Sequence, residues 1–203
     1  MIDLNPTKRL TCNQCGYPQI TCLCPWVNPI TPPLNIIILQ HPKEAKHAKN
    51  TVKLLSLGLQ KITVLQGETP EDWAELAQKV VDQPQNYGLF FPHKQSSSVE
   101  FISSQEQKTR YFPVNHHVIF IDASWRKALK IWHLNPWLLQ CNSWHFINPP
   151  KNQYHIRRTT QVRSLSTLES VAYVLEHTHN INCVSLHTLL FKMQQKCFSK
   201  NYS

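Results

Sequence analysis

The sequence has few glycines, few acidic residues and no long apolar run, and each shortage excludes a class of protein. Only four of the 203 residues are glycine. Neither the GxGxxG pattern of dinucleotide-binding folds nor the GxxxxGK[ST] pattern of P-loops occurs. No stretch of 18 apolar residues is present, so we expect no membrane-spanning helix. The first residues, MIDLNPTKRL, do not join a basic segment to an apolar one, so we expect no secretory signal and a cytoplasmic protein.

The shortage of acids leaves a strongly basic chain. Twelve Asp and Glu residues stand against 21 Lys and Arg, which gives a formal net charge of +9. A surplus of this size indicates a polyanionic partner, most commonly nucleic acid. A basic enzyme without such a partner is the alternative. Because 41% of the residues are hydrophobic and the chain has 203 residues, we expect one globular domain with a substantial core.

Short apolar segments alternate with helical patterns from residue 35 onwards. Five segments are typical of strands buried on both faces: NIIILQ, KITVLQ, YGLFFP, HHVIFID and SWHFIN. Helical patterns occur at about 43–57, at 70–82, from Trp125, at 166–179 with a capping box, and at about 184–197. This alternation predicts an α/β fold with a mostly parallel sheet and helices on both faces. We predict a Cys-rich segment over 1–33 and one α/β domain over 34–203.

Four of the seven cysteines lie within the 13 residues CNQCGYPQITCLC. They are Cys12, Cys15, Cys22 and Cys24. Four thiolates with this spacing can hold one tetrahedral Zn²⁺. The alternative is a pair of disulfides, which cytosolic proteins rarely keep. A metal with four protein ligands has no open position, so the predicted zinc site is structural.

Asp122 ends the apolar run VIFID and precedes a basic helix that starts after Ser124. Ligands of open α/β sheets bind at the carboxyl ends of the strands, where such a helix also presents unpaired N–H groups. We expect Trp125, Leu129 and Trp132 to face the core, because they fall at i, i+4 and i+7. The residues off that stripe are Arg126, Lys127 and Lys130. Asp122 is therefore either a helix cap or a carboxylate that acts beside a bound polyanion.

A long basic loop follows the last predicted strand. The segment NPPKNQYHIRRTTQVRSL, residues 148–165, has little apolar periodicity. It contains Tyr154, His155, Arg157, Arg158 and Arg163. Arginine binds carboxylates and phosphates through two hydrogen bonds at once, so this loop is a candidate site for either ion. A solvated basic loop is the alternative.

Several of these blocks together resemble the DTW-domain family. They are DASW followed by A, then LNPWL, YHIRR and STLE, and before them the cysteine cluster, LQHPKEAKHAKNT and LFFP. They run in the family's order from about residue 12 to residue 169. The family's Asp-x-Thr-Trp signature appears here as Asp122-Ala123-Ser124-Trp125, in which Ser124 keeps the hydroxyl and Ala123 stands where glycine is expected. The resemblance implies a tRNA-uridine aminocarboxypropyltransferase that uses S-adenosylmethionine. It also implies a SPOUT-like fold with a trefoil knot near the C-terminal strands.

The resemblance assigns tasks to particular residues. In the implied reaction, N3 of a uridine attacks the methylene carbon on the sulfonium, and methylthioadenosine leaves as a neutral thioether. The step needs a base for the N3 proton, and Asp122 is the candidate. Candidates for binding adenosylmethionine are Phe91, Pro92, Ser124, Trp125, Arg157, Ser166 and Thr167. Candidates for binding tRNA are Arg126, Lys127, Lys130, Arg158 and Arg163; Arg157 and Arg158 suit the methionine carboxylate and the RNA backbone equally.

Further positions match the family without a defined task. They are His41, Glu44, Asn50 and Thr51. Two other functions stay open: a SPOUT-type RNA methyltransferase, which moves the methyl group instead, and a zinc-containing RNA-binding protein without catalysis. The sequence does not predict the oligomeric state or the uridine that is modified.

Overall fold

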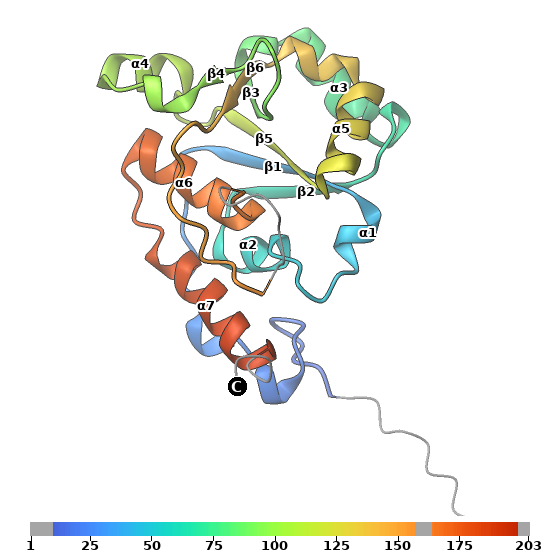
Figure 1. Ribbon diagram of the computed structural model, residues 1–203, viewed down its shortest axis with the longest axis vertical. Helices are drawn as coiled ribbons and strands as arrows, with labels where there is room; N and C mark the ends of the chain where they lie inside the picture. The colour runs from blue at the N-terminus through green and yellow to red at the C-terminus, as the bar shows by residue number, and fades with distance from the viewer. Residues whose placement is uncertain (1–9, 157–163, 199–203) are drawn as a thin grey trace, which may run out of the picture.

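The computed structural model describes residues 10–156 and 164–198, which build a six-stranded sheet between two layers of helices (Figure 1). The strand order is β2-β1-β5-β3-β6-β4, and the paired strands are all parallel. The strands are β1 (Asn35–Gln40), β2 (Ile62–Gln66), β3 (Tyr87–Phe90), β4 (Ser97–Ser98), β5 (His117–Asp122) and β6 (Asn142–His145). The predicted α/β class is confirmed. Four of these strands lie in predicted segments, and β6 overlaps the fifth segment, starting one residue before it. The two-residue β4 was not predicted.

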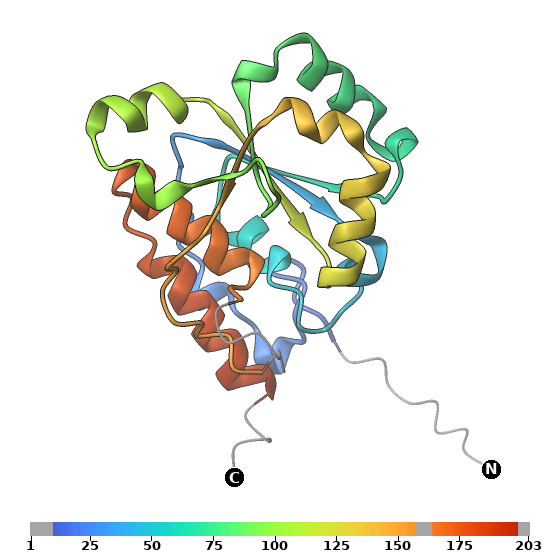
Figure 2. The same ribbon diagram turned by 45° about the horizontal axis from the view of Figure 1, so that its top comes forward.

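The helices cover both faces of the sheet, as predicted (Figures 1 and 2). They are α1 (Pro42–Ala45), α2 (Val52–Gly58), α3 (Ala74–Asp82), α4 (Gln105–Tyr111), α5 (Trp125–Leu134), α6 (Thr167–His179) and α7 (Val184–Phe198). Short 3-10 turns occupy Gln19–Thr21 (η1), Cys24–Trp26 (η2), Pro70–Trp73 (η3), Pro84–Asn86 (η4), Val99–Phe101 (η5) and Pro136–Gln140 (η6).

The alternation of side chains along the central strands creates two separate cores. Ile36 and Ile38 of β1 pack with α2, α6 and α7, whereas Ile37 and Leu39 pack with α3 and α5. Successive side chains of a strand point to opposite faces, so a strand that is apolar throughout is buried on both sides. The pairing of β1 with β5 also places Gln40 beside Asp122 at the carboxyl end of both strands.

The predicted single helix over about 43–57 is wrong. It is two helices, α1 and α2, separated by residues 46–51. His41 caps α1 by accepting a hydrogen bond from the N–H of Lys43. The Asn50 side chain accepts a hydrogen bond from the N–H of Val52, the first residue of α2, and so marks the start of a new helix. Short polar side chains that bind the backbone in this way favour helix ends over helix interiors.

The Cys-rich segment packs against α7, at the end of the molecule where that helix stops (Figure 1). Its residues Cys15, Tyr17 and Leu23 are buried in the same apolar core as α2, α6 and α7. The boundary at residue 33 remains a prediction, as does the trefoil knot. The connection from β6 to α6 includes residues 157–163, which lie outside the described residues. No helix in the described part of the chain is long and apolar enough to cross a lipid bilayer.

Candidate active site

Asp122 is held by three residues from two segments of the chain at the carboxyl end of the sheet. Its Oδ1 accepts a hydrogen bond from Thr167 Oγ1 at 2.5 Å, and its Oδ2 accepts one from Gln40 Nε2 at 2.9 Å. Its backbone oxygen accepts a third from the N–H of His41. Both carboxyl oxygens act as acceptors, as those of an ionised carboxylate do. The side chain is buried, with 8% of the residue exposed.

Two residues of the block LQHPKEAKHAKNT, Gln40 and His41, hydrogen-bond to Asp122. Gln40 Nε2 donates to Asn50 Oδ1 at 3.3 Å as well as to Asp122. His41 caps α1, and its Nε2 lies 3.5 Å from Glu68. The matched residues therefore position Gln40 and the start of α1 against the end of β5.

A pocket of about 850 Å³ opens beside Asp122 at the carboxyl ends of β3, β5 and β6. Six of the predicted cofactor-binding residues line it: Phe91, Pro92, Ser124, Trp125, Ser166 and Thr167. The seventh, Arg157, lies outside the described residues, as do Arg158 and Arg163. Asp122 does not line the pocket itself, although its neighbours Ile121 and Ala123 do. Thr167 is the residue that both lines the pocket and contacts the carboxylate.

Helices α5 and α6 both begin at this pocket, and the hydroxyl groups of their N-cap serines make different hydrogen bonds. Ser124 occupies the N-cap position of α5 but makes no side-chain capping hydrogen bond. Ser166 caps α6 through the predicted capping box with Glu169, which is confirmed. The Ser124 hydroxyl is therefore available to a ligand, whereas that of Ser166 is engaged with the helix.

Glu169 connects the long loop to α6, and sequence analysis found only its capping role. Its Oε1 accepts from the N–H of Gln153 at 2.6 Å, and its Oε2 accepts from both N–H and Oγ of Ser166. Glu169 is 4% exposed. It therefore fixes the part of the loop whose Asn152 and Tyr154 line the pocket.

The expected core-facing stripe on α5 is wrong for Trp125, whereas Leu129 and Trp132 are partly buried and pack against the core. The buried residues of α5 are Ala128 and Ile131, and Trp125 is 50% exposed. Trp125 is the first residue of the helix and lies beyond the end of the sheet, where it lines the pocket and stacks on Phe91 at 5.7 Å. Phe91 also stacks on Trp132. Of the expected stripe, only Trp125 lines the pocket, and Phe91 connects its ring to that of Trp132.

His145 is a pocket residue that sequence analysis missed. It ends β6, and its Nδ1 lies 2.9 Å from Ser96 Oγ. Ser96 Oγ donates its hydrogen to the carbonyl of His93, so it accepts from His145. Nδ1 of His145 then carries the proton and Nε2 is left as an acceptor. The available signal was that His145 lies in the predicted strand SWHFIN, and ligands bind at the carboxyl ends of such strands.

The basic residues predicted to bind tRNA differ in their surroundings. Arg126 is exposed. Lys127 forms an ion pair with Glu44 at 3.0 Å, and Lys130 forms one with Glu68 at 3.2 Å. His155 is exposed and is not among the residues that line the pocket. Of the described basic residues on α5, Arg126 therefore has the least neutralised charge.

The four clustered cysteines converge on one point. Their sulfur atoms all lie within 4.8 Å of one another, with 3.5 Å between Cys12 and Cys24 and 3.7 Å between Cys15 and Cys22. Zn–S bonds of about 2.3 Å in a tetrahedron place sulfur atoms about 3.8 Å apart, so the cluster fits a metal ion. Backbone N–H groups of Cys15 and Gln14 lower the pKa of Cys12 to about 6, which favours the thiolate that binds metal. The cysteines are not joined in disulfides.

Comparison with known proteins gives one family and several relatives. The family model described as "DTW domain" matches residues 9–198. A mouse protein named tRNA-uridine aminocarboxypropyltransferase 2 is 29% identical over 195 residues, which cover 94% of this chain and 63% of that protein. A Drosophila melanogaster protein of the same name is 30% identical over 177 residues, or 84% of this chain and 67% of that protein. A Macaca fascicularis protein, again so named, is 28% identical over 202 residues. No solved structure matched.

Proposed function

Because the chain belongs to the DTW domain family, we propose that it transfers the 3-amino-3-carboxypropyl group of S-adenosylmethionine to N3 of a uridine in tRNA. The names of its relatives supply the aminocarboxypropyl transfer to a tRNA uridine, and the family resemblance supplies the donor and the N3 position. The chain spans between 63% and 67% of the length of these relatives. The observation that carries the proposal is the pocket at the strand ends, with the Asp122–Thr167 hydrogen bond in its wall.

The lining of the pocket suits adenosylmethionine. When bound, this donor supplies an electrophilic methylene carbon on a sulfonium whose leaving group, methylthioadenosine, is neutral. Aromatic side chains of Phe91, Phe120 and Phe146 line the pocket and offer surfaces for a purine ring. The N-termini of α5 and α6 begin in its wall and favour a carboxylate through their backbone N–H groups. The uncommitted hydroxyl of Ser124 adds a donor there.

Asp122 is the base in this proposal, and it acts through Thr167. The uridine N3–H gives its proton to Thr167 Oγ1 as that hydroxyl passes its own proton to Asp122 Oδ1. The N3 electron pair forms the bond to the methylene carbon, and the C–S bond electrons stay with sulfur. No general acid is required because the leaving thioether is neutral.

The remaining assignments support the same function. Arg126, together with Arg158 and Arg163 outside the described residues, binds the tRNA backbone, and Lys127 and Lys130 contribute where their ion pairs open. Zn²⁺ bound by the four cysteines is structural, because no ligand position remains for a substrate.

The products decide between this function and its alternatives. The protein is incubated with adenosylmethionine and unmodified tRNA, the nucleosides are analysed by mass, and the small-molecule product is identified. We expect aminocarboxypropyluridine and methylthioadenosine. A methylated nucleoside with S-adenosylhomocysteine would identify a methyltransferase. Tight tRNA binding without either product would identify a non-catalytic RNA-binding protein.

A further inference from the structure

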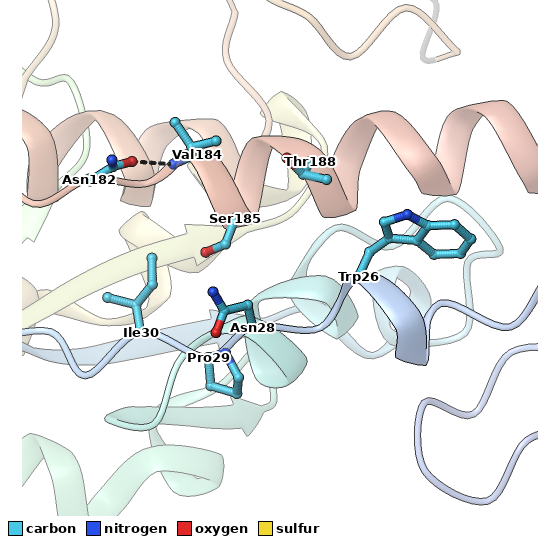
Figure 3. A pocket seen from close by; sticks show the side chains of 8 residues that line it. All are labelled: Trp26, Asn28, Pro29, Ile30, Asn182, Val184, Ser185 and Thr188. Carbon is cyan, nitrogen blue, oxygen red and sulfur yellow. Dashed lines mark hydrogen bonds between the residues drawn. The ribbon is translucent and has the colours of Figure 1, made fainter.

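A second cleft lies between the Cys-rich segment and the start of α7 (Figure 3). It has a volume of about 410 Å³ and shares no lining residue with the pocket at the strand ends. The residues that line it are Trp26, Asn28, Pro29, Ile30, Asn182, Val184, Ser185 and Thr188. We call this cleft the α7 groove. Nothing in the proposed transfer reaction uses it.

One face of α7 carries polar and basic residues along this groove. Ser185, Thr188, Lys192 and Lys196 follow one another at i, i+3, i+7 and i+11, so they form one line on the helix surface. The buried residues of α7 belong to an adjacent face: they are Leu186, Leu189, Leu190 and Met193. The polar line is about 16 Å long at 1.5 Å per residue. That length matches several nucleotides of a strand at about 3.4 Å each along the helix axis.

Two lysines at the end of this line lie against an aromatic ring of the Cys-rich segment. Lys192 Nζ is 5.5 Å and Lys196 Nζ is 4.8 Å from the centre of the Trp26 ring. Lys53 Nζ lies 4.1 Å from the ring of Tyr17 in the same segment. Within the described residues, none of these lysines forms an ion pair. Their charges are therefore available to a partner.

Acidic residues are missing from the elements that form this surface. The sequence has no Asp or Glu between residues 10 and 43, and none after Glu176. Glu176 lies on α6 and pairs with His187, which faces away from the line of polar residues on α7. The only charged side chains on this line of α7 are therefore the basic Lys192 and Lys196, which suits a polyanion.

The groove also offers hydrogen bonds that the protein does not use. Ser185 Oγ is buried and has no hydrogen-bond partner within the described residues. The Asn28 side chain approaches it from the opposite wall (Figure 3). A buried hydroxyl without a partner is costly, and a ligand oxygen would remove that cost. Hydroxyl and amide groups beside lysines are the usual contacts to phosphate and ribose.

We propose that the α7 groove, with Trp26, Lys192 and Lys196, binds the sugar–phosphate backbone of the tRNA at a distance from the uridine that reacts. This inference rests on the proposed function for the identity of the RNA. The Cys-rich segment supplies one wall of the groove, so a metal held by its four cysteines would stabilise that wall. Contacts of this kind position a nucleic acid without reading its sequence.

The test reverses two positive charges on α7 and, as a control, two matched positive charges on α4. The variant Lys192→Glu/Lys196→Glu is compared with Lys108→Glu/Arg110→Glu on α4. Each pair lies on one helix, has one half-buried and one exposed member, and includes a cation over a neighbouring aromatic ring. Both variants change the net charge equally, so a general electrostatic effect appears in both.

We expect the α7 variant to weaken tRNA binding by at least about tenfold at 0.1 M salt, and the α4 variant to change it far less. The plot of log K against log salt should become shallower by about 2 for the α7 variant. KM for tRNA should rise more than kcat falls, while adenosylmethionine affinity and the melting temperature stay near wild type. Equal effects of the two variants on tRNA binding would overturn the inference. Failure of the wild-type protein to bind or modify tRNA would instead refute the proposed function.

Discussion

Asp122 and Thr167 lie 45 residues apart in the sequence, yet their side chains meet at 2.5 Å. Asp122 can be proposed as a site residue because it ends a predicted strand, and Thr167 because it lies in the block STLE that resembles the DTW-domain family. The contact between their side chains cannot be predicted from the sequence, because it depends on how α6 packs over β5. In the proposed reaction, the carboxylate would therefore reach the pocket through the Thr167 hydroxyl and not directly.

Replacing Thr167 tests this relay. Thr167→Val keeps the shape of the side chain but removes the hydroxyl, so we expect single-turnover transfer to slow by about 10-fold to 100-fold. Loss of the hydrogen bond to a buried carboxylate should also cost about 1–3 kcal/mol of stability. Thr167→Ser keeps the hydroxyl and is the control, with transfer near the wild-type rate. Equal rates for the Val and Ser variants would exclude Thr167 from proton transfer.

At the scale of helices and strands, the strands were the most predictable elements. NIIILQ and HVIFID are apolar throughout, and a strand buried on both faces requires such a run. The helix at α5 was misread because its apolar residues fit two different faces. Spacing alone favoured Trp125, Leu129 and Trp132. The fully buried residues of the helix are Ala128 and Ile131, while Leu129 and Trp132 are only partly buried against the same core. The choice between those faces depends on where the helix starts relative to the end of the sheet.

The connection between α6 and the long loop gives a prediction at this scale. Glu169→Ala removes the acceptor for the N–H groups of Gln153 and Ser166, both of which are then left without their partner. We expect a loss of about 2–3 kcal/mol in the free energy of unfolding. Adenosylmethionine affinity should fall too, because the tethered loop lines the pocket.

Thermal unfolding measures the loss of stability, and calorimetric titration measures the affinity for adenosylmethionine. Glu169→Gln is the matched control variant in both measurements. Its amide keeps one acceptor oxygen, so its losses should be smaller than those of the Ala variant. An Ala variant that melts and binds adenosylmethionine like wild type would show that Glu169 does not hold the loop.

At the scale of the whole molecule, the pocket was predictable only in part. Sequence motifs indicated residues just after β3 and at the starts of α5 and α6, and all six that the structure describes line one cavity. His145 and the loop residues Asn152 and Tyr154 were not predicted to line it. Their approach depends on the position of β6 next to β3 and on the tether from Glu169. Such long-range contacts leave no local pattern in a single sequence.

The cysteine cluster gives a prediction for the whole chain, because Cys15 is part of the core beside α7. Purified protein should contain about one Zn²⁺ per chain. Cys15→Ser should lose the metal and melt at a lower temperature. Cys141→Ala is the control, since Cys141 is buried in the other core and lies outside the cluster. Metal analysis and melting curves decide: a metal-free wild type, or full metal in the Cys15 variant, would refute the zinc site.

The most direct test of the account is single-turnover transfer by Asp122→Asn, with tRNA and adenosylmethionine both saturating. Asparagine keeps the shape and can still accept from Gln40 or Thr167, but it cannot take a proton at neutral pH. We predict a rate about 10²-fold to 10⁴-fold below wild type, with the fold retained and the affinity for both ligands nearly unchanged. A rate within a few-fold of wild type would contradict the account, and His145, whose Nε2 is left as an acceptor beside the same pocket, would become the base to test.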